Sequence, residues 1–263
     1  MIDESTAVLR TTSSGVAWLT LNRPDKRNAL HAGLVEELKR QLTIADGDEQ
    51  VRVVAIRGAG KDFCSGADLS ALQQMATATA LENLADVDAM AELFLLIRRI
   101  SKPVVALVHG RALAGGCGLA TACDLVLAAE SANFGYPEVR IGFVPAMVMA
   151  ILRRNVSEKR AFDLIISGET LSAAEAERIG LINRVFPDEE YEMQGEIYLN
   201  DLASRSASAM QLCKRLLYHQ DSLSFEAAIR AGADINVVAR MTEDTRAGIA
   251  KFVAGARPAT GSS

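Results

Sequence analysis

The chain has 263 residues, of which 49% are hydrophobic and 23% charged, and its formal net charge at neutral pH is −5. This length and composition exclude a disordered or fibrous protein and allow one large domain or a core with an appendage. The acidic balance argues against nucleic acid as the main partner, because phosphate binding needs clustered lysine and arginine.

The N-terminus, Met1-Ile2-Asp3-Glu4, is acidic and resembles neither a secretory signal nor a transit peptide. Charged residues interrupt the longest apolar stretches, so we expect no membrane-spanning segment. The four cysteines lack Cys-x-x-Cys spacing, and none stands near a pair of histidines that could complete a metal site. We therefore expect reduced, mostly buried thiols, no bound metal and a cytoplasmic location.

In the first half of the chain, patterns typical of strands and helices alternate. Leucines recur every four residues from 30 to 42 among charged neighbours, as an amphipathic helix requires. The predicted strands are 16–21, 51–58, 103–108 and 124–129, and the predicted helices are 30–42, 81–100 and 119–123. Strands that alternate with helices are typical of parallel sheets with helical crossovers, so the sequence predicts an α/β fold.

From about residue 145 the strand patterns fade and helical patterns dominate. The predicted helices of this half are 157–167, 172–179, 191–203, 207–218 and 225–239. No linker rich in proline, glycine or serine separates the two halves. We therefore predict a core at residues 1–200 and a helical region at residues 201–263 that packs on the core or on a neighbouring subunit.

A run of small residues, Ala114-Gly115-Gly116-Cys117-Gly118, stands between the strand at 103–108 and the helix at 119–123. Small residues at such a junction let backbone N–H groups approach a ligand closely. The start of a helix adds unpaired N–H groups and a partial positive charge. The run therefore predicts a site that stabilises an oxygen atom as it becomes negative during a reaction.

Two other loops and the histidines admit more than one interpretation. The segment Arg57-Gly58-Ala59-Gly60-Lys61 lacks the spacing of a P-loop and the third glycine of a dinucleotide fingerprint, which favours a plain turn. The segment Phe63-Cys64-Ser65-Gly66-Ala67-Asp68-Leu69 lacks the Gly-x-Ser-x-Gly pattern, which argues against a serine hydrolase. Structural roles explain His31, His109 and His219 better than a role as catalytic base.

Glu138 ends the segment Phe134-Gly135-Tyr136-Pro137-Glu138. A glutamate after a proline is ordinarily a solvated loop residue. Here the apolar neighbours Ile141, Phe143 and Val144 can bury its carboxyl group, and burial would raise the pKa of that group towards acid–base work.

Together these segments resemble the crotonase superfamily, the enoyl-CoA hydratases and isomerases. The resemblance covers nearly the whole chain. It is carried in chain order by residues 21–24, 28–30, 63–69, 114–117, 122–124, 134–138 with Gly142 and Pro145, and 168–183. The resemblance implies an α/β crotonase-like spiral of ββα units, with a helical C-terminal region that builds homotrimers or dimers of trimers.

The resemblance also implies roles for single residues. The backbone N–H groups of Ala67 and Gly115 would bind the thioester oxygen of an acyl-CoA and stabilise its enolate, and Glu138 would transfer protons. The second glutamate of a hydratase falls on Gly118, which cannot transfer a proton. A glutamate introduced at position 118 is expected to raise hydration if the loop holds its side chain near water.

Two activities stay open at this point. One is hydration or dehydration of an enoyl-CoA, including a branched or carboxylated one that resembles methylglutaconyl-CoA. The other is isomerisation of a 3-enoyl-CoA to a 2-enoyl-CoA by Glu138 alone. A non-catalytic acyl-CoA-binding or scaffold protein is an alternative of a different class, and the retention of Glu138 beside both oxyanion segments argues against it.

For the coenzyme A moiety, the resemblance implies contacts with the phosphates at Lys26 and Arg27, for which a solvated surface role is the alternative. The loop residues implied in binding are Ser65, Gly66, Ala67, Asp68 and Leu69. Phe252 and Arg257 match a segment that often reaches the coenzyme A of an adjacent subunit. No cofactor beyond this moiety of the substrate is implied. Acyl selectivity is expected at residues 72–90 and 143–149.

Overall fold

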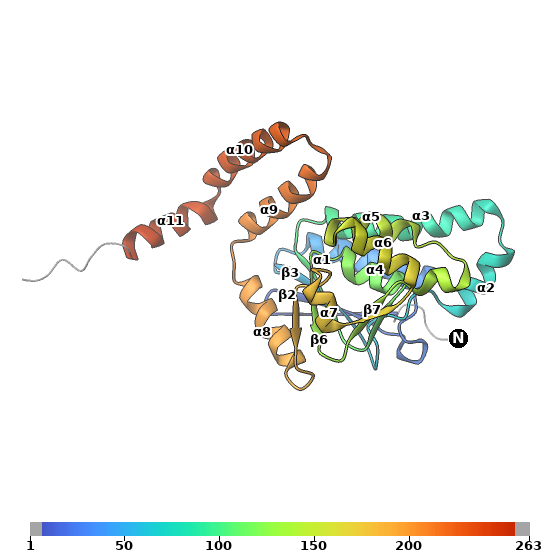
Figure 1. The fold of residues 1–263 in the computed structure, drawn as a ribbon. Helices are drawn as coiled ribbons and strands as arrows, with labels where there is room; N and C mark the ends of the chain where they lie inside the picture. The colour runs from blue at the N-terminus through green and yellow to red at the C-terminus, as the bar shows by residue number, and fades with distance from the viewer. Residues whose placement is uncertain (1–6, 256–263) are drawn as a thin grey trace, which may run out of the picture.

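A six-stranded sheet with the strand order β1-β2-β3-β4-β6-β9 forms the centre of the computed structural model, which describes residues 7–255 (Figure 1). Its strands are β1 (Val8–Ser13), β2 (Val16–Leu21), β3 (Val53–Gly58), β4 (Val104–Val108), β6 (Leu125–Ala129) and β9 (Arg184–Phe186). Only the β1–β2 pair is antiparallel, and every other neighbouring pair in this sheet is parallel. The α/β class predicted from the alternating pattern is confirmed.

A second, smaller sheet has the order β5-β7-β8. Its strands are β5 (Arg111–Leu113), β7 (Asn133–Gly135) and β8 (Thr170–Ser172). The β5 and β7 strands run parallel, whereas β7 and β8 run antiparallel. In the chain, β5 follows β4, β7 follows β6 and β8 follows α6.

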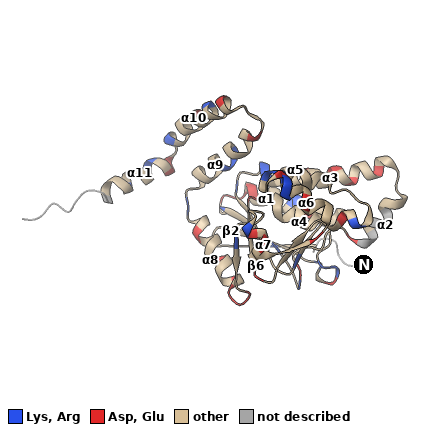
Figure 2. Ribbon diagram, in the orientation of Figure 1, with Lys and Arg blue, Asp and Glu red and all other residues tan. Residues whose placement is uncertain are grey.

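Helices cover both faces of the large sheet. The helices of the chain are α1 (Ala32–Gly47), α2 (Leu69–Thr77), α3 (Ala80–Arg99), α4 (Gly115–Ala122), α5 (Ala146–Asn155), α6 (Glu158–Ser167), α7 (Ala173–Arg178), α8 (Tyr191–Ala203), α9 (Ala207–His219), α10 (Phe225–Met241) and α11 (Glu243–Gly255). The described residues also include the short 3-10 helices η2 (Pro24–Lys26), η3 (Pro137–Ile141) and η4 (Gln220–Ser222). Lys and Arg alternate with Asp and Glu along several of these helices (Figure 2).

The two faces of the large sheet carry separate apolar clusters, because successive side chains of a strand point to opposite faces. On β2, Ala17 and Leu19 join the larger cluster with α1, α3, α4 and α5. Val16 and Trp18 of the same strand join a smaller cluster that α8 covers. The strands are therefore buried on both sides, which explains their continuous apolar sequence.

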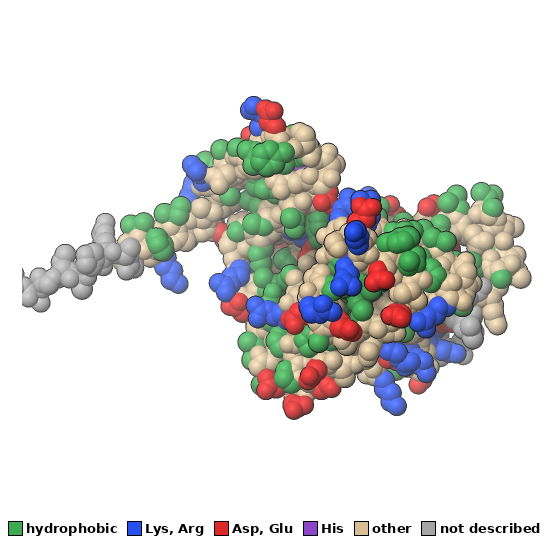
Figure 3. All heavy atoms as spheres, viewed as in Figure 1, with side chains coloured by type: hydrophobic (Ala, Val, Ile, Leu, Met, Phe, Trp, Pro, Cys, Tyr) green, Lys and Arg blue, Asp and Glu red, His purple; other side chains and the backbone are tan. Residues whose placement is uncertain are grey.

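The last three helices extend away from this body (Figure 1). Hydrophobic side chains lie along them in the space-filling view (Figure 3). Among these, Phe225 and Phe252 are 84% and 78% exposed. Helix α10 has no buried residue at all. The division into residues 1–200 and 201–263 stays a prediction, but the exposed apolar faces on α10 and α11 are those expected of helices that pack on another surface.

Helix α9 is nonetheless tied to the core through the buried side chain of Lys214. Its ammonium group donates hydrogen bonds to the carbonyl oxygens of Ile97 at 2.7 Å and Lys102 at 2.9 Å. It also lies 2.7 Å from Oδ2 of Asp124. Burial lowers the pKa of Lys214, and the negative charge of Asp124 opposes that shift. The charge is therefore paired inside the protein, as a buried charge must be.

Most sequence-based elements are confirmed, with four differences. The helix predicted at 119–123 begins at Gly115, so the glycines form its first turn. Two strands, β8 and β9, occur after residue 145, where the sequence patterns predicted mainly helices. The other strands that the sequence missed are β1, β5 and β7, and the missed helices are α2, α5 and α11. Strands of three residues are too short to show a periodic pattern.

The structure also tests the predictions about the cysteines and about membrane-spanning segments. All four cysteines are free; Cys64, Cys117 and Cys123 are buried, whereas Cys213 is exposed. The expectation of mostly buried thiols is thus confirmed. Among the helices of residues 7–255, none is both long enough and apolar enough to cross a membrane.

Replacement of Lys214 by methionine tests the anchor of α9. We expect Lys214→Met to lower the free energy of unfolding by about 3–5 kcal/mol, because it leaves the partly buried carboxylate of Asp124 without its ion-pair partner. Chemical denaturation followed by circular dichroism measures this loss. The matched control is Lys159→Met on the exposed face of α6, for which we expect a change within about 0.5 kcal/mol.

Candidate active site

Three segments identified in the sequence analysis begin at a row of residues whose backbones pair with one another. Cys64 forms a parallel bridge with Ala112, and Ala112 pairs in parallel with Phe134. Hydrogen bonds of 3.0 Å join Cys64 N to Arg111 O and Leu113 N to Cys64 O. Since all three segments run in the same direction from this row, their next few residues reach the same place. Those residues include Ala67, Gly115 and Glu138.

The N–H group of Ala67 points away from the segment with which Ala67 pairs. Ala67 forms a parallel bridge with Leu30. In this bridge Leu30 donates to Gly66 O at 2.7 Å and accepts from Asp68 N at 3.0 Å. A residue between two such bonds directs its own N–H and C=O to the other side. Ala67 is also exposed.

Gly115 is the first residue of α4, and its N–H group belongs to the first turn of that helix. The first four N–H groups of a helix have no acceptor within it. The preceding residue, Ala114, adopts φ 51° and ψ −128°, a conformation that favours glycine. The Ala114 N–H donates to Gly135 O at 2.8 Å, which holds this strained junction against β7. Strain of this kind concentrates at functional sites.

The loops that carry Ala67 and Gly115 are in contact. A Cβ atom on Gly66 would lie 2.9 Å from the Cβ of Ala114 and 3.7 Å from the N of Gly115. A Cβ atom on Gly116 would lie 2.3 Å from the carbonyl oxygen of Cys64. Glycine is therefore required on both sides of the contact. The residues that would donate to an oxyanion thus lie on two loops in direct contact.

Glu138 lies in η3, which continues from the end of β7. Its side chain is half-buried, and Oε2 is shielded from solvent and has no hydrogen-bond partner among residues 7–255. Burial raises the pKa of the Glu138 carboxyl group. A sheltered carboxyl group with a raised pKa is suited to accept and return a proton near neutral pH.

Contacts with α4 place Glu138 next to the oxyanion segments. The hydroxyl group of Tyr136 lies 3.1 Å from Oγ1 of Thr121, in α4. Burial is the main cause that raises the pKa of Tyr136 and of Cys117. The negative charge of Glu138 also raises both pKa values, so the carboxylate is close to both side chains. The turn that carries Glu138 is thus fixed on the helix that begins with Gly115.

The place next to Gly118, where the resemblance puts the second glutamate of a hydratase, is filled. A Cβ atom at position 118 would lie 2.2 Å from Cγ1 of Val148 and 3.4 Å from Cζ of Phe94. The sequence-based expectation that a glutamate at position 118 would reach water does not fit this packing, because α5 covers the position. Within residues 7–255 no group of three or more His, Cys, Asp and Glu residues could hold a metal ion.

The residues implied in coenzyme A binding form a second group beside this site. Lys26 and Arg27 are exposed, and the carbonyl oxygen of Arg27 accepts a hydrogen bond of 3.1 Å from Ser65 N. Asn28 is fully buried, and its Nδ2 donates to Ala59 O at 2.9 Å and Asp62 O at 2.7 Å. The structure therefore brings the basic residues and the loop of Ser65 together, around the amide of Asn28, to which the sequence analysis assigned no separate role.

The remaining residues implied in binding lie in different surroundings. The carboxylate of Asp68 is buried and lies 2.9 Å from the guanidinium group of Arg23, so it holds its own loop. Leu69 begins α2. Phe252 lies on α11, which extends away from the body of its own chain (Figure 1). Arg257 lies outside the described residues.

The histidines have structural partners. His31 precedes α1 and accepts a hydrogen bond of 3.2 Å from Gly33 N, which caps the helix. A ring nitrogen of His109 lies 2.9 Å from the carbonyl oxygen of Gly60. His219 is the last residue of α9. These positions agree with the structural interpretation of all three.

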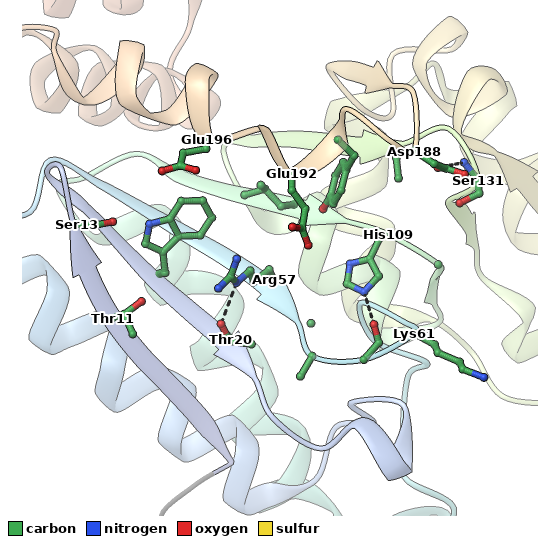
Figure 4. Close-up of a pocket in the computed structure, with 18 residues that line it drawn as sticks. Thr11, Ser13, Thr20, Arg57, Lys61, His109, Ser131, Asp188, Glu192 and Glu196 are labelled. Atoms are coloured by element: carbon green, nitrogen blue, oxygen red, sulfur yellow. Dashed lines mark hydrogen bonds between the residues drawn. The ribbon is translucent and has the colours of Figure 1, made fainter. Parts of the chain in front are cut away.

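A separate cavity of about 960 Å³ lies on the α8 side of the large sheet and is lined by neither Ala67, Gly115 nor Glu138 (Figure 4). Two of its charged side chains have partners within the protein: Arg57 donates to Thr20 Oγ1 at 3.1 Å, and Asp188 accepts from Ser131 N at 3.0 Å. Packing explains Gly58 in its wall, where a Cβ atom would lie 2.3 Å from Asp62 O. The interpretation of residues 57–61 as a plain turn stays a prediction.

The α/β architecture brings the loop of Ala67, the start of α4 and the turn of Glu138 into one region of the molecule. A family model described as Enoyl-CoA hydratase/isomerase matches residues 11–259. The chain therefore belongs to the enoyl-CoA hydratase/isomerase family, of the crotonase superfamily, and is an enzyme of that class.

Individual relatives agree with this assignment. A 2,3-dehydroadipyl-CoA hydratase of Escherichia coli is 34% identical over 242 residues, 90% of this chain and 92% of that protein. The crystal structure of a Mycobacterium smegmatis enoyl-CoA hydratase is similar with a TM-score of 0.90 at 30% identity, over 96% of this chain and 98% of the other. An enoyl-CoA hydratase structure from Bacillus anthracis gives a TM-score of 0.89 at 29% identity, over 96% and 98%.

A methyl group at position 66 tests the contact between the two oxyanion loops. We expect Gly66→Ala to lower kcat by about 10²–10³, the usual loss of one oxyanion donor, because φ is +97° and the new Cβ would displace Ala67 from Gly115. Steady-state kinetics measures this effect. Gly47→Ala is the control, since a Cβ there meets nothing within 4 Å. Unchanged kcat in a folded Gly66→Ala enzyme would show that the N–H group of Ala67 is not an oxyanion donor.

Proposed function

We propose that this enzyme binds an acyl-CoA thioester with its carbonyl oxygen between the N–H groups of Ala67 and Gly115, and shifts a carbon–carbon double bond with Glu138 as its single proton carrier. The observation that carries this proposal is the solitary, half-buried carboxyl group of Glu138, with one oxygen that lacks a partner among the described residues. The filled place beside Gly118 supports it, because no second carboxylate is accommodated there.

The reaction needs only this one carboxyl group. The Glu138 carboxylate removes a proton from C2 of a 3-enoyl thioester, and the electron pair of that C–H bond moves towards the thioester oxygen. The two N–H groups stabilise the negative charge on that oxygen. The neutral carboxyl group then returns its proton to C4, the C3–C4 double bond becomes C2–C3, and the carboxylate is regenerated. The atoms balance without water or a further cofactor.

Hydration of an enoyl-CoA is the second candidate, and the relatives favour it, since several are described as enoyl-CoA hydratases. The dehydroadipyl-CoA hydratase acts on a carboxylated acyl group by its name, so a carboxylated substrate belongs to this candidate. Water addition requires a base for the water and a proton for the neighbouring carbon. Glu138 would have to perform both tasks in succession, which makes this the less direct function for the site.

For coenzyme A we propose that the exposed basic residues Lys26 and Arg27 bind its phosphates and that the loop of residues 65–69 lies along it. The contact between Arg27 O and Ser65 N supports this group as one surface. We further propose a homotrimer or a dimer of trimers in which α11 of one subunit brings Phe252 to the coenzyme A of the next. The exposed apolar faces of α10 and α11 support this arrangement.

Incubation in deuterium oxide with 2-enoyl and 3-enoyl thioesters tests the proposed function. Mass spectrometry and NMR follow deuterium uptake and product structure. A shifted double bond with deuterium at C2 or C4 and no added water is the expected result. A 3-hydroxyacyl product without a shift would establish the hydratase instead, and the absence of both exchange and product would contradict acyl-CoA proton transfer.

Glu138→Gln is expected to abolish proton exchange at C2 while acyl-CoA affinity stays within about tenfold, because the amide cannot take up a proton. Isotope exchange and a binding titration measure these two effects. The backbone N–H groups of Ala67 and Gly115 are unchanged in this variant, so retained binding is its internal control. Full turnover by the Gln variant would exclude Glu138 from the mechanism.

The raised pKa of Glu138 also predicts the pH dependence of activity and stability. The ionised form is the base, so kcat/KM should fall as pH decreases through a value above the ordinary glutamate range. Because the folded state holds this proton more tightly, wild-type stability should fall as pH rises from the ordinary range to the raised pKa. Glu138→Gln should therefore be more stable than wild type at neutral pH, but not at low pH. Denaturation at several pH values measures the difference.

Phe252→Asp tests the role proposed for α11. The substitution places a charge on an apolar face, and we expect a lower molar mass by light scattering together with weaker acyl-CoA binding. Asp234→Asn, on the polar side of the neighbouring helix α10, should change neither property. An unchanged mass for a folded Phe252→Asp enzyme would exclude this residue from the subunit interface.

A further inference from the structure

The cavity on the α8 side of the large sheet lies at the carboxyl ends of the parallel strands β2, β3, β4 and β6. The loops at 59–61 and 109–110 line it on the side of the sheet, and α8 lines it on the other side (Figure 4). In open α/β sheets, ligands bind in the crevice outside the carboxyl ends of the strands. Its volume of about 960 Å³ suits a small organic molecule.

Tyr191, the first residue of α8, lines this cavity and carries a polar atom without a partner. The residue is 7% exposed, and its hydroxyl group has no hydrogen-bond partner among residues 7–255. Most buried side-chain polar atoms in proteins have at least one partner, because an unpaired one is costly. A ligand in the cavity that accepts a hydrogen bond would remove this cost.

The hydroxyl group of Tyr191 lies among charged groups of the same cavity. The ring of Tyr191 is 6.2 Å from the ring of His109. Burial raises the pKa of the Tyr191 hydroxyl group, the charge of Glu192 raises this pKa further, and the charge of Arg57 lowers it. His109, Glu192 and Arg57 all line the cavity. The unpaired hydroxyl group is therefore close to both a carboxylate and a guanidinium group.

Helix α8 supplies the acidic wall of the cavity. Glu192 and Glu196 are four positions apart, so they lie on one face of the helix, and both line the cavity. The carboxylate of Glu192 points into it, between Arg57 and His109 (Figure 4). Within the described part of the chain, neither glutamate forms an ion pair. The two carboxylates can therefore receive a cationic group from a ligand.

The edge of the sheet supplies the basic wall. Arg57 donates through Nε to Thr20 Oγ1 at 3.1 Å, and its guanidinium group lies 4.8 Å from the centre of the Trp18 ring. These contacts hold the group in place, while its two outer nitrogen atoms have no acceptor among residues 7–255. Lys61 lines the same wall. A guanidinium group with free outer nitrogen atoms is suited to bind a carboxylate.

We propose that this cavity is a second binding site of the enzyme and that its ligand is a small zwitterion, a molecule with both an ammonium and a carboxylate group. The ammonium group pairs with Glu192 and Glu196. The carboxylate pairs with Arg57 and accepts a hydrogen bond from the hydroxyl group of Tyr191. A ligand with a single charge leaves one of the two walls unpaired, so the site discriminates against it. The inference uses no residue of the proposed active site.

Trp18 is the only tryptophan of the chain and lines the cavity, so its fluorescence reports on occupancy. The test titrates the full-length enzyme with glycine, β-alanine, γ-aminobutyrate and ε-aminohexanoate, in which the separation of the two charges increases. We expect a saturable change of fluorescence with at least one of these zwitterions. Butyrate and butylamine carry one charge each, and we expect them to bind at least about tenfold more weakly than that zwitterion.

Tyr191→Phe and Glu192→Gln separate binding from folding. The Tyr191 hydroxyl group has no partner, so its removal should not lower the stability against denaturant, but it should weaken zwitterion binding about tenfold. Glu192 is exposed, and its replacement should weaken binding to a similar degree in a folded protein. The matched controls are Tyr198→Phe and Glu189→Gln, which lie in or next to α8 outside the cavity and should bind as wild type does.

Absence of a saturable signal with every zwitterion overturns the proposal. Equal affinity for butyrate overturns it too, because the site would then be a plain anion site. An equal loss of binding in the two control variants would show a general effect of α8 and exclude the assigned contacts. Light scattering covers the remaining case: a lower molar mass of Glu192→Gln would place this wall in a contact between subunits and contradict a ligand site.

Discussion

The register between Cys64, Ala112 and Phe134 is the constraint on which the site depends. Backbone pairing aligns three segments that are far apart in the chain and sends them in one direction. The site residues then follow within four positions of this row. A shift of one residue in any of the pairings would turn its segment to the opposite face and separate the two N–H groups. The chemistry is therefore determined by backbone geometry before any side chain acts.

Close approach at this row requires small residues and tolerates strain. Glycine at positions 66 and 116 lets two backbones meet, and Ala114 adopts a conformation that costs of order 1–3 kcal/mol for a residue with a side chain. Buried polar groups hold the loops that carry this strain. Arg111, for example, donates two hydrogen bonds of 2.8 Å to the carboxylate of Asp62. If these loops form the proposed oxyanion site, it is built before substrate binds, which is how such sites stabilise charge most effectively.

The packing of α5 on α4 explains why position 118 has no room for a side chain. Glycine at position 118 is what allows Val148 to approach so closely, and Val148 in turn makes the neighbourhood of α4 apolar. The two residues act as one feature, because either a side chain at 118 or a smaller residue at 148 would change the same space. Glu138 remains as the only acid–base group identified at the site, and its burial raises its pKa for that task.

Local patterns in the sequence predicted the long strands and helices, and the family resemblance supplied the expected roles of Ala67, Gly115, Glu138 and Gly118. The sequence by itself could not predict β5 and β7, since three residues show no period, nor the conformation of Ala114, which the pairing with β7 imposes. The contact of Val148 with Gly118 was also beyond it. That contact joins residues thirty positions apart, and only the packing of α5 on α4 brings their atoms together.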